Sequence, residues 1–393
     1  MGVQVVGRIK NTSRMTESSL YDVAIVGGGL AGLALSIQLR SKGHSVILVE
    51  KESYPFHKVC GEYISMESWN FLKGLGVDLD GLQVSIITKM QLSSASGKML
   101  QQSLPLGGFG ISRYLLDKTL ANIAARVGVQ ILQETKVNDI TYNDGVFTID
   151  CSQQQFRARV ACACYGKRSN MDVKWKRPFA LAPKNKINNY IGVKYHIKAD
   201  FPADTIALHN FKNGYCGVVK IEGDLFNLCY LVRADNLKQS KGDIKAMERM
   251  ILAKNPHLAK IFLESESSFT APVTISQVSF DKKSQVEDHV LMIGDAAGMI
   301  TPLCGNGMSM ALHGSQLAAK HIDAYLEEKI SRAQLEELYT SEWNKNFARR
   351  LLVGRRIQRL FGSRMLSNIF IGLLKPVPIL LKMLVRQTHG KPF

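Results

Sequence analysis

Three glycines with the spacing Gly-x-Gly-x-x-Gly, at Gly27, Gly29 and Gly32, directly follow an apolar run over 21–26. Such glycines allow a tight turn, let the backbone approach a pyrophosphate and let the next helix pack closely on the strand. The free N–H groups at the start of that helix, and its positive dipole end, attract phosphate. The spacing therefore predicts a loop that binds the phosphates of a dinucleotide.

Glu50 ends a second apolar run, over 45–49, about 20 residues beyond this loop. An acid at this place accepts hydrogen bonds from ribose hydroxyls and disfavours a 2′-phosphate. The alternative is an ordinary βαβ unit that carries a surface glutamate. The loop and the acid together favour FAD or NAD in this pocket over NADP.

A second polar segment follows the apolar run over 290–293. Asp295 is expected where a buried strand ends, so it can accept hydrogen bonds from a polyol chain. Pro302 fixes a rigid turn, and the glycines after it let the backbone approach a flat ligand. The next helix directs its N-terminus at that ligand, which would stabilise negative charge on a reduced flavin. The alternative is a strand, a turn and a helix with a capping aspartate. The residues expected to bind here are Gly294, Asp295, Pro302, Gly305, Asn306 and Gly307.

Length and pattern indicate more than one domain, because 393 residues exceed one simple core. A strand-rich region over 186–235 interrupts the nucleotide-binding elements, and 242–265 reads as helical. We expect an α/β fold with a Rossmann-like nucleotide-binding domain, an inserted β-sheet substrate domain and a C-terminal helical region. The predicted segments are 20–80, 106–178 and 276–330 for the nucleotide-binding domain, 81–105 and 179–275 for the substrate domain, and 331–393 for the basic C-terminal region.

The formal net charge of +17 is concentrated at the C-terminus. No acidic residue follows Glu342, whereas eleven lysines and arginines do. The apolar stretch over 367–385 is interrupted by lysines and prolines, so it is too broken to span a membrane. It suits a helix at a membrane interface, where cations meet anionic lipids. The alternative is a helical cap on the substrate domain with its cations in water. Nucleic-acid binding is not expected, because no known module accompanies the charge.

The seven cysteines are scattered and form neither a disulfide framework nor a metal knuckle. This pattern predicts a reducing compartment and no metal site. Residues 1–20 lack the apolar core of a signal peptide. We therefore expect a cytoplasmic protein, peripheral to the inner face of a membrane if its basic tail binds lipid.

The two glycine-rich segments together resemble the FAD-dependent monooxygenase superfamily, which includes the aromatic hydroxylases and the geranylgeranyl reductase branch. The resemblance covers about 20–330 and implies an isoalloxazine ring between the two domains. It implies that the first loop holds the FAD pyrophosphate, Glu50 the adenosine ribose and Asp295 the ribityl chain. Gly305 to Gly307 would lie beside the pyrimidine side of the flavin. Arg113 matches the FAD-contacting arginine of that family at a helix start.

Three stretches bear on which branch the chain follows. The family's Asp-Gly motif, used by FAD and by the nicotinamide donor, is replaced by Tyr165-Gly166, and Lys167 and Arg168 offer a phosphate-bearing donor another site. Cys60-Gly61 matches a pair near the flavin in the reductase branch, so Cys60 is a candidate catalytic residue, the alternative being a small packing residue. The strand over 214–219 lacks the aromatic motif of the reductases. The Trp-rich motif of flavin halogenases is also missing.

We therefore expect an FAD-dependent oxidoreductase with NAD(P)H as electron donor. The leading hypothesis is a monooxygenase that hydroxylates or epoxidises an apolar, polyketide- or isoprenoid-like substrate through a flavin C4a-hydroperoxide. The first alternative is a flavin reductase that saturates prenyl double bonds. The second is a membrane-associated flavoprotein that passes electrons to a partner.

Overall fold

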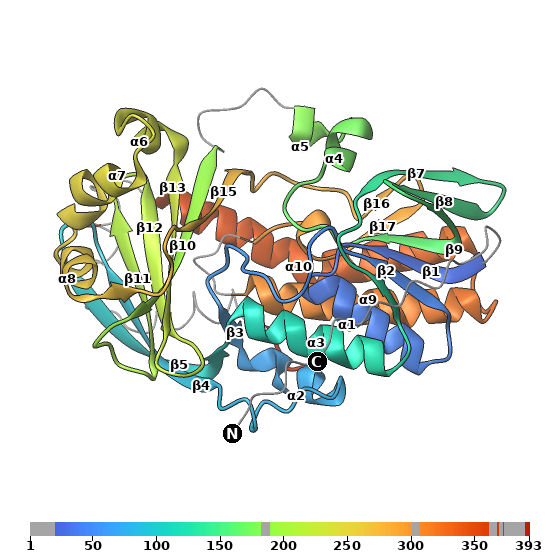
Figure 1. The fold of residues 1–393 in the computed structure, drawn as a ribbon, viewed down its shortest axis with the longest axis horizontal. Coiled ribbons are helices and arrows are strands. Elements are labelled where there is room, and N and C mark those ends of the chain that lie inside the picture. The colour runs from blue at the N-terminus through green and yellow to red at the C-terminus, as the bar shows by residue number, and fades with distance from the viewer. Residues whose placement is uncertain (1–19, 182–188, 301–305, 361–367, 369–371, 373–389) are drawn as a thin grey trace, which may run out of the picture.

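The computed structural model describes residues 20–181, 189–300, 306–360, 368, 372 and 390–393. Figure 1 shows two sheets at opposite ends of the molecule, with helices packed beside and between them. The strands are β1 (Leu20–Val26), β2 (Val46–Val49), β3 (Tyr63–Ser65), β4 (Ser85–Ser93), β5 (Met99–Gly110), β6 (Gln130–Leu132), β7 (Val137–Asn143), β8 (Val146–Cys151), β9 (Gln155–Ala163), β10 (Tyr190–Lys198), β11 (Thr205–Phe211), β12 (Gly214–Lys220), β13 (Phe226–Arg233), β14 (Glu266–Ser267), β15 (Val273–Val278), β16 (Val286–Glu287) and β17 (Val290–Met292). The helices are α1 (Leu30–Ser41), α2 (Trp69–Gly74), α3 (Arg113–Arg126), α4 (Asn170–Lys174), α5 (Pro178–Leu181), α6 (Ala234–Gln239), α7 (Ile244–Met250), α8 (Pro256–Glu264), α9 (Gly307–Leu326) and α10 (Arg332–Leu360).

The first sheet, called here the cofactor sheet, has a parallel centre in the order β17-β9-β1-β2-β6. Its strands β1 and β2 are apolar along almost their whole length, as expected where helices cover both faces. Helix α9 packs on α1, and α10 packs on α9. Because the central strands are parallel, their carboxyl ends meet at one edge, which is where such sheets bind ligands.

The second sheet, called here the substrate sheet, has the order β14-β10-β13-β12-β11-β4-β5-β3, with β15 also paired to β10. Alternate residues of β10, β12 and β13 face a separate core that includes residues of α7 and α8. Their other face is directed toward the cofactor sheet. The α/β class with a nucleotide-binding sheet, a second β-sheet and a helical C-terminal region is confirmed.

The strands cross two of the boundaries predicted from the sequence. Strand β3, at Tyr63–Ser65, pairs with β5 in the substrate sheet although the prediction counts 20–80 with the nucleotide-binding domain. Strand β5 continues past residue 105 to Gly110. The domain boundaries themselves stay a prediction.

The region over 242–265, expected to be helical, consists of α7, a 3-10 turn at Leu252–Lys254 and α8. Asn255 caps α8 by accepting the N–H of His257, and Pro256 is its first residue. Proline has no N–H and its ring clashes with a preceding helical turn, so a new helix begins there.

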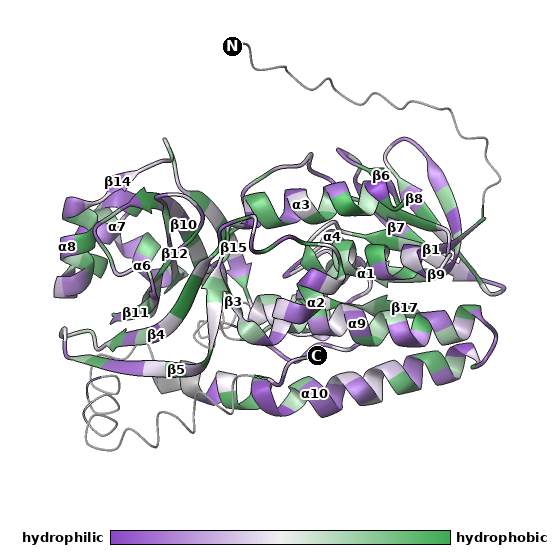
Figure 2. Cartoon of the chain, turned by 90° about the horizontal axis from the view of Figure 1, so that it is seen from below, coloured by the Kyte–Doolittle hydropathy of each residue, from purple (hydrophilic) through white to green (hydrophobic). Residues whose placement is uncertain are grey.

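The C-terminal region contains the long helix α10, whose surface alternates between polar and apolar residues (Figure 2). Within the described residues, no helix combines the length and the apolar character that crossing a membrane requires. The segment predicted to lie at a membrane interface, 367–385, falls almost wholly outside the described residues. Peripheral membrane contact therefore stays a prediction.

Candidate functional site

The turn after β1 has the geometry that its glycines predict. Gly27 has φ +105°, and a β-carbon there would lie 2.6 Å from the carbonyl oxygen of Cys164 at the end of β9. A β-carbon on Gly32 would lie 2.1 Å from the carbonyl oxygen of Gly27. Glycine is therefore required at both places, once for the turn and once for the packing of α1 on it.

Two cations stand beside this turn. A β-carbon on Gly29 would meet Nη2 of Arg113 at 3.6 Å and Nζ of Lys58 at 3.8 Å. Arg113 forms a bidentate pair with Asp117 through two contacts of 2.7 Å, and Lys58 lies 3.2 Å from the same carboxylate. Burial opposes ionisation of Asp117, but both cations together hold its pKa below the ordinary value. Lys58 also lies 4.0 Å from Glu50. The turn thus has two cations beside it that can pair with the phosphates of a pyrophosphate.

Glu50 braces the same turn. Its Oε2 accepts the N–H of Gly28 at 2.8 Å, and its Oε1 accepts the N–H of Glu52 at 3.1 Å. The side chain is buried, yet it lines the cavity described below. A carboxylate oxygen can accept more than one hydrogen bond, so Glu50 retains capacity for the ribose hydroxyls expected from the sequence.

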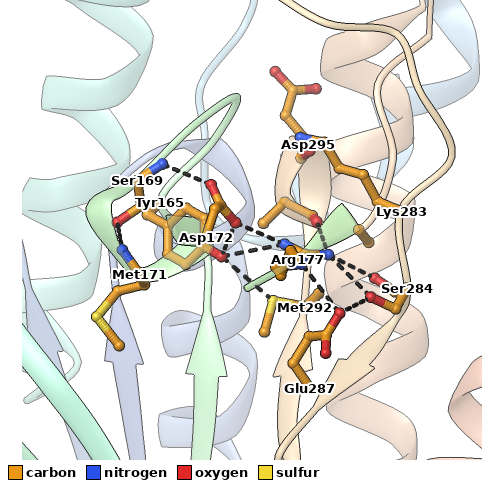
Figure 3. Close-up of polar contacts among 12 residues, drawn as sticks. Tyr165, Ser169, Met171, Asp172, Arg177, Lys283, Ser284, Glu287, Met292 and Asp295 are labelled. Atoms are coloured by element: carbon orange, nitrogen blue, oxygen red, sulfur yellow. Dashed lines mark hydrogen bonds and ion pairs between the residues drawn. The ribbon is translucent and has the colours of Figure 1, made fainter. Parts of the chain in front are cut away.

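Asp295 follows β17, and Gly294 before it has φ +67°. Figure 3 shows the Asp295 carboxylate directed away from the polar network behind it. The backbone of this residue is held by Lys283, whose Nζ donates to the carbonyl oxygens of Asp295 at 2.7 Å and of Lys167 at 2.9 Å. Burial lowers the pKa of Lys283 to about 8. The side chain of Asp295 is thus presented on a fixed backbone.

Arg177 forms the centre of that network (Figure 3). Its guanidinium has no exposed surface and donates to Asp172 at 2.9 Å, to Glu287 at 3.2 Å and to the carbonyl oxygen of Ala296 at 3.1 Å. Tyr165, at the place of the missing Asp-Gly motif, donates to the same aspartate at 2.6 Å. One arginine therefore fixes the turn after β9 relative to the turn after β17.

Only part of the second glycine-rich segment can be placed. Asn306 is buried at the position before α9, and Gly307 is the first residue of that helix. Pro302 and Gly305 lie outside the described residues. The flavin-side roles predicted for these four residues stay predictions.

A cavity of about 850 Å³ joins the two sheets, a size typical of sites for cofactors and small molecules. It brings together most of the residues singled out in the sequence, whereas Gly32 and Asn306 do not line it. The sequence-predicted residues in its wall are Gly27, Gly29, Glu50, Cys60, Arg113, Lys167, Arg168, Gly294, Asp295 and Gly307.

The part of the cavity against the substrate sheet is mainly apolar. Its wall alternates along the strands, as expected for one face of a sheet. The apolar residues there include Ile206, Leu208, Tyr215, Val219, Leu231, Val273, Ile275 and Val278. A large apolar group is the ligand that this part can bind with a gain in free energy.

A buried ionic cluster at this wall was not anticipated from the sequence. Glu62 accepts hydrogen bonds from Lys194, from Nε2 of His196 at 2.7 Å and from the backbone N–H of Arg113 at 2.7 Å. Burial opposes ionisation of Glu62, but Lys194 and His196 together hold the pKa of the carboxyl below its ordinary value. The cluster ties β10 to the 57–62 loop and to the start of α3. Its signal was available: Lys194 and His196 alternate with apolar residues in a buried strand.

Cys60, the candidate catalytic residue, is half-buried in the same loop and lines the cavity. Its carbonyl oxygen accepts a hydrogen bond from Nδ2 of Asn227 on β13 at 3.1 Å. The loop is thus fixed to the substrate sheet on both sides of Gly61. A catalytic role for Cys60 stays a prediction.

These features fit FAD. The glycine turn and its two cations form a cradle for a pyrophosphate. Asp295 lines the cavity, with its carboxylate directed away from the network around Arg177 (Figure 3). Residues 20–352 match the family model described as "FAD binding domain". The chain belongs to this FAD binding domain family. It is accordingly an FAD-dependent oxidoreductase.

Known relatives share its sequence at low identity. The chain is 26% identical over 363 residues to "Conditioned medium factor receptor 1" of Dictyostelium discoideum, a match covering 84% of this chain and 69% of that protein. It is 24% identical over 330 residues to "Digeranylgeranylglycerophospholipid reductase 1" of Methanothermobacter thermautotrophicus, covering 78% of each.

A solved flavin-dependent brominase is similar in fold to this oxidoreductase. It superposes with a TM-score of 0.77 at 20% identity, over 94% of this chain and 93% of the brominase. Membership of the FAD-dependent monooxygenase superfamily, expected from the glycine motifs, is confirmed. Within the described residues, no group of three or more histidine, cysteine or acidic side chains is arranged to hold a metal ion.

Proposed function

We propose that this FAD-dependent oxidoreductase is a monooxygenase that hydroxylates or epoxidises an apolar substrate. The observation that carries the proposal is one continuous cavity that runs from the phosphate-binding turn to the apolar wall of the substrate sheet. FAD, when reduced, supplies the two electrons that activate oxygen. One oxygen atom enters the substrate and the other leaves as water, while NAD(P)H is oxidised to NAD(P)⁺.

The chain's own residues bind, orient and shield. Arg113 and Lys58 neutralise the pyrophosphate, Asp295 binds the sugar chain, and the apolar wall excludes water from the reacting carbon. Lys167 lines the cavity and Arg168, beside it, is exposed, so this pair offers a cationic approach for the phosphates of NAD(P)H. The donor and the oxygen-based route remain proposals.

An oxygen-dependence experiment tests the proposal. The purified holoprotein is reduced with NADH or NADPH without oxygen, oxygen is admitted, and the flavin absorbance is followed with and without a panel of alkylphenols and polyenes. We expect a substrate to accelerate NAD(P)H oxidation and to gain one atom of ¹⁸O from ¹⁸O₂. Incorporation of ¹⁸O only from labelled water would contradict monooxygenation.

Saturation of prenyl double bonds is the second candidate. It is favoured by Cys60-Gly61 in the cavity wall and by the similarity to a digeranylgeranylglycerophospholipid reductase. Bound reduced FAD would supply a hydride to one carbon of the double bond, and a proton would complete the C–H bond at the other carbon. Anaerobic reoxidation of the reduced protein by a geranylgeranyl lipid, with a mass gain of two hydrogens, would establish this reaction in place of the first.

A further inference from the structure

The substrate sheet contains one glycine that no neighbouring protein group explains. In the described strands of this sheet, a β-carbon on Gly108, Gly110 or Gly214 would lie 2.5 Å or less from a backbone oxygen. Gly107 has a positive φ, and a β-carbon on Gly192 would lie 2.8 Å from Val59. These five positions therefore need glycine for the fold.

Gly217 is the exception. A β-carbon there would have only ordinary contacts, with the carbonyl oxygen of Cys229 at 3.6 Å and with Cδ2 of Leu208 at 3.7 Å. Its φ is not in the left-handed region. Glycine inside a strand costs stability and often marks the close approach of a ligand. Here the missing side chain leaves a gap in the wall of the cavity.

The strand register locates this gap. Gly217 on β12 pairs with Leu208 on β11 and with Cys229 on β13, and Cys229 pairs in turn with Lys194 on β10. Tyr215 and Val219, two residues away on the same strand, point to the same face. The gap thus has apolar or weakly polar neighbours, with the buried cation two strands away.

The floor of the gap is paired backbone. Strand β12 is paired on both sides at Gly217, with β11 and with β13. In an antiparallel ladder the N–H and C=O of one residue point to the same neighbouring strand, so the peptide groups of Gly217 lie within the sheet and do not face the cavity. A bare peptide plane in this orientation offers a ligand contact area but no hydrogen bond. Flat apolar groups, such as aromatic or conjugated rings, fill such a slot best.

We propose that Gly217 is a specificity-determining residue that admits a flat, ring-bearing apolar group of the substrate against the bare backbone of β12. The inference rests on the proposed function only in taking the apolar part of the cavity as the substrate site. It adds the shape of the group that binds there.

The test uses the holoprotein and N-phenyl-1-naphthylamine, a flat apolar fluorophore, with decan-1-ol as a flexible competitor. We expect Gly217→Ala to weaken binding of the fluorophore about threefold and Gly217→Leu to weaken it tenfold or more, because a side chain would occupy the slot. Displacement by decan-1-ol should change less than about threefold. The double variant Leu208→Ala with Gly217→Leu creates space beside the slot, because alanine is smaller than leucine. It should recover part of the affinity for the fluorophore.

Three results would overturn the proposal. The first is wild-type affinity for the fluorophore in a Gly217→Leu protein that retains its FAD. The second is the absence of fluorophore binding by the wild-type protein. The third is loss of FAD from Gly217→Leu, which would assign the gap to the flavin. Failure of the oxygen-dependence experiment with an intact Gly217 effect would instead refute monooxygenation alone.

Discussion

The cofactor half of the cavity is made of backbone turns and charged side chains, whereas the substrate half is made mainly of apolar side chains on four strands, β11, β12, β13 and β15. In the first half, Gly27 and Gly32 cannot carry a β-carbon without striking main-chain oxygen. In the second, Gly217 can. The difference teaches that the phosphate-binding turn depends on its glycines, whereas the strand position of Gly217 can accept a side chain without striking the backbone.

The largest effect is expected from Gly32→Val. A β-carbon there lies 2.1 Å from the carbonyl oxygen of Gly27, so the turn and α1 must separate. We expect protein without bound FAD, measured by flavin absorbance per chain after gel filtration. Gly74→Ala is the matched control, because a β-carbon at Gly74 meets nothing within 4 Å. Full FAD content in Gly32→Val would show that the turn can bind FAD without the close packing of α1.

The second-largest effect, on the free energy of unfolding, is expected at the ion pair between Lys194 and Glu62, where the two halves of the cavity meet. Lys194→Met leaves the fully buried Glu62 without its ammonium partner, and breaking such a pair costs about 3–5 kcal/mol in the free energy of unfolding. Urea denaturation measures it. Adding Glu62→Gln removes the orphan charge and should restore a large part of the loss.

The same cluster predicts acid sensitivity. The pKa of Glu62 is lower in the folded protein than in the unfolded chain. Its contribution to the free energy of unfolding is therefore complete above the pKa of the unfolded chain, and it is lost as the pH falls through the pKa of the folded protein. The double variant Lys194→Met with Glu62→Gln could instead lose as much free energy of unfolding as the two single variants together. That result would show that the cluster acts through packing and not through charge.

Lys283, behind the cofactor half, predicts alkaline behaviour. Its pKa is lowered from 10.5 to about 8 by burial, so between these values the unfolded chain binds more protons and the folded state gains stability as pH rises. Relative to Lys283→Met, the wild-type protein should gain about 2–3 kcal/mol between pH 7 and 10.5. Thermal unfolding across this range measures it, with Lys51→Met as an exposed control. Parallel curves for the wild type and Lys283→Met would refute the assignment.

The smallest effect is expected at Asp295, where the fold needs little from the carboxylate. The Asp295→Asn protein should be as stable as the wild type but should bind FAD more weakly. A charged hydrogen bond is worth about 1.5–3 kcal/mol, which corresponds to roughly ten- to 150-fold in affinity. Titration of the apoprotein with FAD, followed by quenching of flavin fluorescence, measures this. Unchanged affinity would remove Asp295 from the cofactor site.

What could be predicted from the sequence follows the same division. Gly27, Gly29 and Gly32 lie within six consecutive residues, so their spacing in the sequence is enough to predict the phosphate-binding turn. By contrast, the partner of Lys194, Glu62, lies more than a hundred residues away in the sequence. The neighbours of Gly217 lie on the paired strands β11 and β13, and only the register of the substrate sheet places them beside it. The helical character of 242–265 was predictable, but its division at Pro256 into separate helices was not predicted.

The network of Arg177 has a consequence for the order of assembly. It joins the turns after β9 and β17 through side chains and carbonyl oxygens that belong to the protein alone. The two turns therefore hold their relative position before any nucleotide arrives, and little conformational entropy is lost at the moment of loading. FAD can therefore bind after the chain has folded, and the apoprotein should remain folded in its absence.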